Sequence, residues 1–149
     1  MKLTLGVDAQ RLWNDTGLHV TAGQRLRVVA SGRWRDWTIE TDADGFSRAH
    51  LKLAEPLRRA PMARWFQLCG AVDRRLDQVV VLGQDVAFTA PASGRLFLFA
   101  NDVSWMHWNN AGRITVQILT DDGASPGAGR AGAQADAVYP PTPGQETTR

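Results

Sequence analysis

Hydrophobic and polar residues alternate along much of the chain with the two-residue period that is typical of β-strands. Residues 2–8 read K-L-T-L-G-V-D, and residues 24–32 read Q-R-L-R-V-V-A-S-G. Because successive side chains of a strand point to opposite faces, this pattern predicts strands with one face in a core and the other in solvent.

The later part of the chain predicts further strands. Residues 64–72 form a nearly continuous apolar run, which is typical of a central strand covered on both faces. Residues 79–82 and 86–90 flank a short segment that contains Gly, and this arrangement predicts a hairpin. Residues 95–100 and 113–119 predict two more strands, one on either side of a polar loop.

Helical periodicity is weak by comparison. Residues 51–59 predict a single helical turn at most, because Pro56 interrupts the segment. About eight or nine short strands with closely spaced turns predict an all-β fold, an antiparallel β-sandwich, over residues 1–120. Residues 121–149 are rich in Pro, Gly and Ala and poor in large apolar side chains. We therefore expect a disordered tail there.

Composition narrows the classes of protein that the chain fits. Its 149 residues are 44% hydrophobic and carry a formal net charge of +2, as expected of one globular domain with its own core. Acidic residues are interspersed among the Arg residues, so no basic stripe indicates a nucleic-acid partner. The single cysteine, Cys69, excludes an internal disulfide framework. The sequence shows no membrane span or signal peptide, and we expect a soluble protein, cytoplasmic by default.

The polar loop between the last two predicted strands carries the candidate chemistry. It opens with Asn101-Asp102 and closes with Asn109-Asn110. Asp and Asn present the hard oxygen atoms that calcium coordinates, at about 2.3–2.6 Å. Asp102 is the only carboxylate that we expect at such an ion. Trp105 and Trp108 add apolar surface, and we expect one of them to be buried and the other to stack on a sugar.

Turn chemistry is the alternative explanation for the Asp and Asn residues, because their side chains bond nearby backbone groups in loops. Catalysis is disfavoured. Ser93 lies in an Ala-Ser-Gly turn without a nucleophile elbow, and the three His lack metal-ligand spacing. Asp42 and Asp44 are an ordinary pair of loop acids. The sequence therefore favours a binding protein over an enzyme.

Similarity to a known family is strongest in residues 88–118, which read F-T-A-P-A-S-G-R-L-F-L-F-A-N-D-V-S-W-M-H-W-N-N-A-G-R-I-T-V-Q-I. This segment resembles the galactose-specific PA-I lectin family of bacteria, in which a strand ends in Asn-Asp and a loop leads to Asn-Asn, a small residue and Gly. Weaker similarity lies in A-G-Q-R-L-R-V-V-A-S-G-R-W (22–34) and D-A-D-G-F-S-R-A-H (42–50). Residues 51–78 align poorly.

The resemblance implies a galactose-binding-like jelly roll that acts as a calcium-dependent, non-catalytic lectin module. It implies calcium ligands from the side chains of Asp102, Asn109 and Asn110 and from the backbone carbonyls of Met106 and Trp37. At the sugar, it implies Asp102, Val103, Asn109, His50 and Trp105.

The chain also departs from the family's pattern. Ala111 stands where the family has Ser, and Leu51-Lys52-Leu53 replace the family's Gln and Pro. The expected partner is a galactoside-type glycan, and a homo-oligomer is compatible with this reading. The alternative is a structural or protein-interaction sandwich of the same fold that has lost the sugar site.

Overall fold

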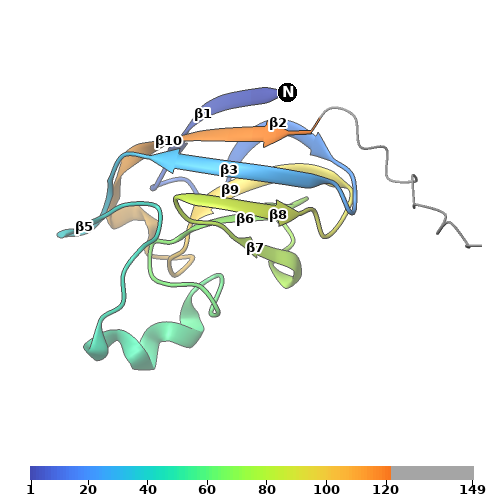
Figure 1. Ribbon diagram of the computed structural model, residues 1–149. Coiled ribbons are helices and arrows are strands. Elements are labelled where there is room, and N and C mark those ends of the chain that lie inside the picture. The colour runs from blue at the N-terminus through green and yellow to red at the C-terminus, as the bar shows by residue number, and fades with distance from the viewer. Residues whose placement is uncertain (122–149) are drawn as a thin grey trace, which may run out of the picture.

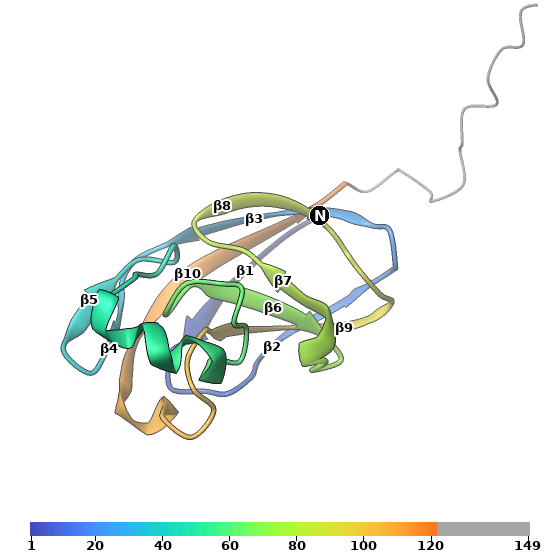
Figure 2. The ribbon, with the colours of Figure 1, turned by 90° about the horizontal axis from the view of Figure 1, so that it is seen from below.

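The computed structural model describes residues 1–121, which form two antiparallel β-sheets packed face to face (Figures 1 and 2). The predicted all-β antiparallel sandwich is therefore confirmed. The predicted tail lies outside the described residues except for Asp121, so the division at residue 120 stays a prediction. No helix within residues 1–121 has the length and apolar character that crossing a membrane requires.

The larger sheet has six strands: β1 (Lys2–Asp8), β3 (Arg25–Ser31), β4 (Trp34–Asp36), β5 (Ile39–Thr41), β8 (Asp85–Thr89) and β10 (Asn110–Thr120). β10 organises this sheet, because it pairs with β1, β3 and β4. β4 follows β3 along the same edge of β10, since both pairings have the same register, with Ser31 opposite Thr115 and Trp34 opposite Gly112. The start of β10 is thereby held beside β4.

The smaller sheet has four strands in the order β2-β9-β6-β7: β2 (Asn14–Val20), β9 (Gly94–Ala100), β6 (Leu68–Val72) and β7 (Val79–Val81). The core lies between the sheets and includes the fully buried side chains of Val7, Val28, Leu68, Leu96, Leu98, Ile114, Val116 and Ile118. Burying one such side chain contributes about 1.5–3 kcal/mol to the free energy of unfolding. On the other face of β9, Phe97 and Phe99 contact the Trp13 ring edge-on, with ring centroids at 6.1 Å and 5.3 Å.

The predicted hairpin of residues 79–82 and 86–90 is wrong. β7 pairs with β6 in the smaller sheet, whereas β8 pairs with β3 in the larger one. The connection therefore passes from one sheet to the other, through Gly83 with a φ of 109°. The apolar pattern locates both strands, but it carries no information about which strand each one pairs with.

Two predictions for the middle of the chain are also wrong. Residues 64–72 are not one strand, because Phe66 adopts a φ of 60° and only β6 is paired as a strand. The predicted single turn is a longer 3-10 helix, η1 (Ala49–Leu57), which contains Pro56. Leu51 and Ala54 of this helix pack against the core, and this tertiary contact supports a helix that the local sequence does not predict.

Three segments gather at one end of the sandwich. They are η1, the turn between β4 and β5, and the β9–β10 loop, which contains the 3-10 helix η3 (His107–Asn109) (Figure 2). The β9–β10 loop connects the smaller sheet to the larger one. A further short helix, η2 (Leu76–Gln78), lies between β6 and β7.

Candidate functional site

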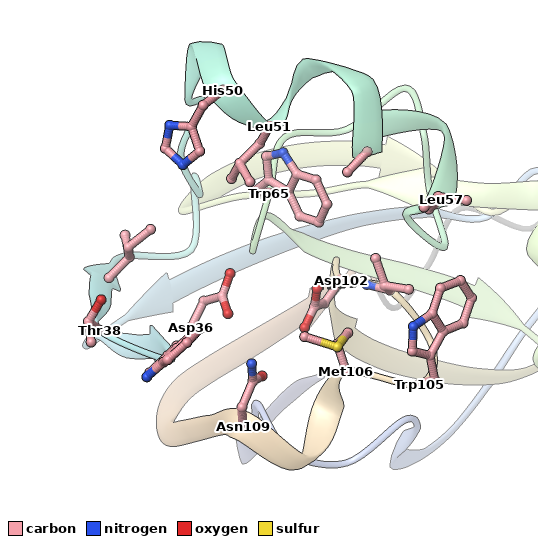
Figure 3. Close-up of a pocket in the computed structure, with 14 residues that line it drawn as sticks. Asp36, Thr38, His50, Leu51, Leu57, Trp65, Asp102, Trp105, Met106 and Asn109 are labelled. Carbon is pink, nitrogen blue, oxygen red and sulfur yellow. Dashed lines mark hydrogen bonds between the residues drawn. The ribbon is translucent and has the colours of Figure 1, made fainter.

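A cavity of about 510 Å³ lies where η1, the β4–β5 turn and the β9–β10 loop meet (Figure 3). It is lined by most of the residues predicted for the site: Trp37, His50, Asp102, Val103, Trp105, Met106 and Asn109. These residues come from three separate segments of the sequence, and the fold brings them together. Asn110, the remaining predicted residue, is buried next to Asn109 and does not line the cavity.

Three side-chain oxygens of the β9–β10 loop and of the first residue of β10 are buried and have no hydrogen-bond partner: Asp102 Oδ2, Asn109 Oδ1 and Asn110 Oδ1. Asp102 is only 3% exposed and Asn110 only 4%. Leaving such an atom unpaired costs roughly 1–3 kcal/mol, and proteins satisfy the great majority of their buried polar atoms. Several such oxygens in one short segment are what a cation-binding site presents.

The other polar atoms of these side chains are engaged, and this fixes the side chains in place. Asp102 Oδ1 accepts a hydrogen bond from the Val103 N–H at 2.7 Å. Asn110 Nδ2 donates to the Ala9 carbonyl at 3.2 Å, which leaves the amide oxygen as the free atom. Gly112 permits the close approach of β10 to β4, because its φ is 93° and a Cβ there would lie 3.0 Å from Trp34 Cα.

The backbone of Trp37 connects the two loops of the site. Its N–H donates a hydrogen bond to the Asn109 carbonyl at 3.3 Å. Trp37 has a φ of 50°, a conformation that is rare for a bulky residue and that is found preferentially at functional sites. The Met106 carbonyl accepts a hydrogen bond from the Asn109 N–H at 3.2 Å and keeps a second lone pair.

Asp36 is a site residue that the sequence interpretation missed. It is the last residue of β4, lies opposite Asn110 in the β4–β10 register and lines the cavity. Its carboxylate is directed across the cavity toward Asp102 (Figure 3). Burial, and then the charge of Asp102, raises the pKa of Asp36 to about 6. Two carboxylates therefore line the cavity, where the sequence predicts one.

Exposed Trp side chains lie around the cavity. Trp105 is 65% exposed and Trp108 is 72% exposed, so the expectation that one of them is buried is wrong. Both belong to the β9–β10 loop, which extends beyond the sheets (Figure 2). Only Trp105 of this pair lines the cavity. Trp37, which is 72% exposed, lines it from the β4–β5 turn.

The helix η1 forms an apolar wall on the other side of the cavity. Leu51, Ala54 and Leu57 line this wall, and the buried Trp65 ring lies beneath the helix (Figure 3). His50 is exposed at the start of η1 and reaches the cavity from there. The sequence did not predict this wall, because residues 51–78 show no clear hydrophobic periodicity and align poorly with the lectin family.

The oxygen atoms at this site are of the kind that hard divalent cations prefer. Carboxylate, amide and backbone carbonyl oxygens are ligands of calcium and magnesium, whereas zinc favours nitrogen and sulfur. Asp36 and Asp102 supply the negative charge, and the Asn side chains supply neutral oxygens. No group of three or more His, Cys, Asp or Glu side chains within residues 1–121 is arranged to hold a metal.

Comparison with solved structures identifies the fold. The N-terminal domain of EclA, a PllA-like lectin, is similar to this chain with a TM-score of 0.62 and 23% sequence identity, over 80% of this chain and 96% of that one. No family model matches the sequence, and no curated protein matches it significantly. The chain therefore has the fold of a PllA-like lectin, and the resemblance noted in residues 88–118 is confirmed at the level of the fold.

Proposed function

We propose that this protein is a non-catalytic carbohydrate-binding module that holds a galactoside-type glycan through a calcium ion. One observation carries the proposal: Asp102, Asn109 and Asn110 present buried, unpartnered oxygens beside a cavity, at the positions that the lectin resemblance implies. The lectin-like fold supports it, because the EclA domain with the same fold is described as a lectin.

Asp102, Asn109 and Asn110 would hold the ion through side-chain oxygens, and Trp37 and Met106 would hold it through backbone carbonyls. Calcium accepts six to eight oxygen ligands, so two neighbouring hydroxyls of a sugar can complete the set. A bound calcium ion thus supplies a direct link between protein and glycan. The hydrogen bond between the Trp37 N–H and the Asn109 carbonyl keeps the two loops in register for this task.

The rest of the cavity suits a sugar, which carries hydroxyls on its edges and C–H groups on its faces. Trp105 offers an exposed indole face beside Asp102, and aromatic rings pack well on apolar C–H surfaces. Val103 adds a small apolar contact from the same loop. His50 can hydrogen-bond the sugar from the helix side, and Leu51 makes that side more apolar.

Calcium dependence of stability tests the proposal. A ligand that binds only the folded state raises the midpoint of thermal unfolding by mass action. We expect millimolar calcium to raise the midpoint and EDTA to reverse the rise. An unchanged midpoint would exclude a calcium site at millimolar concentrations. A glycan array with and without calcium then tests the sugar, and binding to galactosides only in calcium is the expected result.

A structural or protein-interaction sandwich is the second candidate. The exposed side chains of Trp37, Trp105 and Trp108 favour it, because aromatic residues are also enriched in protein interfaces. Metal dependence separates the two candidates. An interaction module that has lost the sugar site would bind its partner equally well in calcium and in EDTA.

A further inference from the structure

Asp36 differs from the other buried or half-buried carboxylates of the fold because its side chain has no partner. Within residues 1–121, no hydrogen bond or ion pair engages its carboxylate. Asp42, by contrast, accepts a hydrogen bond from the Asp44 N–H at 2.9 Å, and Asp44 accepts one from the Gln84 N–H at 2.9 Å. Those two carboxylates stabilise loops, whereas Asp36 serves no such purpose.

The position of Asp36 places it among the predicted cation ligands. The β4–β10 register sets it opposite Asn110, and Trp37 follows it directly in the chain. Across the cavity lies Asp102, whose Oδ2 is buried and also without a partner (Figure 3). Two carboxylates that face each other in a partly buried site repel, and a cation between them removes that repulsion.

We infer that Asp36 is a ligand of the cation, so that this is a two-carboxylate site. The inference rests on the proposed function, because it concerns the same ion. Cation affinity in oxygen-ligand sites rises with the number of charged ligands. The site should therefore hold calcium more tightly than one in which Asp102 is the single carboxylate.

Calorimetric titration of calcium into the full-length protein and two variants tests the inference. Asp36→Asn removes the charge and keeps the shape. Glu40→Gln is the matched control, since Glu40 lies on the neighbouring strand β5 with a side chain that is 64% exposed. We expect Asp36→Asn to weaken calcium binding by about tenfold or more and Glu40→Gln to leave it unchanged. In EDTA, Asp36→Asn should unfold at the wild-type temperature or above, which shows that the variant is folded.

Terbium luminescence tests the assignment independently, because it counts the water molecules that complete the coordination of the ion. Tb³⁺ can replace calcium in such sites, and its emission lifetimes in H₂O and D₂O report how many water molecules it coordinates. Asp36→Ala should raise that number relative to wild type, because water fills the position that the carboxylate leaves. An unchanged number of coordinated water molecules would contradict the assignment.

The outcomes separate this inference from the proposed function. Equal calcium affinity of wild type and Asp36→Asn overturns the inference and leaves the lectin proposal standing. Unchanged calcium affinity with lost galactoside binding also overturns it, because Asp36 would then contact the sugar. If the wild type takes up neither calcium nor terbium, the inference and the calcium-dependent part of the proposed function both fail.

Discussion

Asn101 and Asp102 are adjacent, both are buried, and their side chains are used in opposite ways. Asn101 has all its amide groups engaged: Oδ1 accepts from the Ala60 N–H, and Nδ2 donates to the carbonyls of Ala60 and Arg64, each at 2.9 Å. Asp102 has one oxygen bound to the Val103 N–H and the other without a partner. Burial alone therefore does not separate the two side chains, whereas their hydrogen bonds do: only Asp102 keeps an oxygen that is available to a ligand.

The backbone of Asp102, unlike its side chain, has a structural role. Its carbonyl accepts a hydrogen bond from the Arg59 N–H at 3.1 Å, so the main chain is held while the carboxylate stays available. Asn101 secures the segment that follows η1, and Asp102 faces the cavity whose wall η1 forms. Asn101 thus holds the segment next to the cavity in place, and Asp102 supplies the cavity with an available carboxylate oxygen.

The largest expected effect is the loss of calcium binding in Asp102→Asn. The variant replaces the buried charge by a neutral amide of the same shape, and neutral oxygens compete poorly with water for a divalent cation. We expect calcium affinity to fall by about a hundredfold or more, as measured by calorimetry. The midpoint of thermal unfolding in EDTA should not fall, since the variant also removes repulsion between Asp36 and Asp102. A large fall in EDTA would show that Asp102 is structural after all.

Asn101→Ala should produce the opposite result. It removes three hydrogen bonds and leaves the buried Ala60 N–H without a partner, whereas the carbonyls of Ala60 and Arg64 keep hydrogen bonds from the N–H groups of Ala63 and Gln67. We expect the free energy of unfolding to drop by about 2–4 kcal/mol in urea denaturation. The molecules that remain folded should still bind calcium. Loss of calcium binding without loss of stability would reverse the roles that we assign to the two residues.

Trp105→Ala should weaken sugar binding and spare calcium binding. Trp105 lines the cavity, whereas the equally exposed Trp108 does not, so Trp108→Ala is the matched control. Loss of an aromatic stacking surface should cost about tenfold in galactoside affinity, measured in saturating calcium. Equal losses in the two variants would show that the cavity does not define where the sugar lies.

The smallest expected effect is a pH dependence of stability in EDTA. The pKa of Asp36 is raised in the folded state, from 3.8 to about 6, first by burial and then by Asp102. The folded protein therefore binds a proton that the unfolded chain releases in this range. Its contribution to stability is complete below the lower value and is lost as the pH rises through the higher one. From about pH 5 to 7, the thermal midpoint of wild type should fall relative to that of Asp36→Asn, and parallel curves would argue against the raised pKa.

The sequence predicts the part of the molecule whose signals are local. β1, β3, β9 and β10 follow from apolar periodicity, and the oxygen-rich loop follows from the spacing of Asp102 and Asn109. The separation of β7 from β8 and the length of η1 depend on tertiary packing, which no short segment encodes.

Asp36 escaped prediction for a similar reason. The role that we infer for it depends on the pairing of β4 with β10, a contact between segments far apart in the chain. The position of the His107 side chain is another feature that the local sequence does not predict. His107 lies in the polar β9–β10 loop, yet its side chain is buried with Nδ1 3.2 Å from the Ala9 carbonyl oxygen, and burial lowers its pKa. Only the fold reveals that this side chain points inward.

A direct test of the calcium-bridged site is to titrate galactose and glucose derivatives into wild type and Asp102→Asn, in saturating calcium and again in EDTA. We expect wild type to bind a galactose derivative in calcium and to lose that binding in EDTA, and we expect Asp102→Asn not to bind it in either condition. Binding of the sugar by the variant, or by wild type in EDTA, would contradict a calcium-bridged site. The interaction-module interpretation would then take its place.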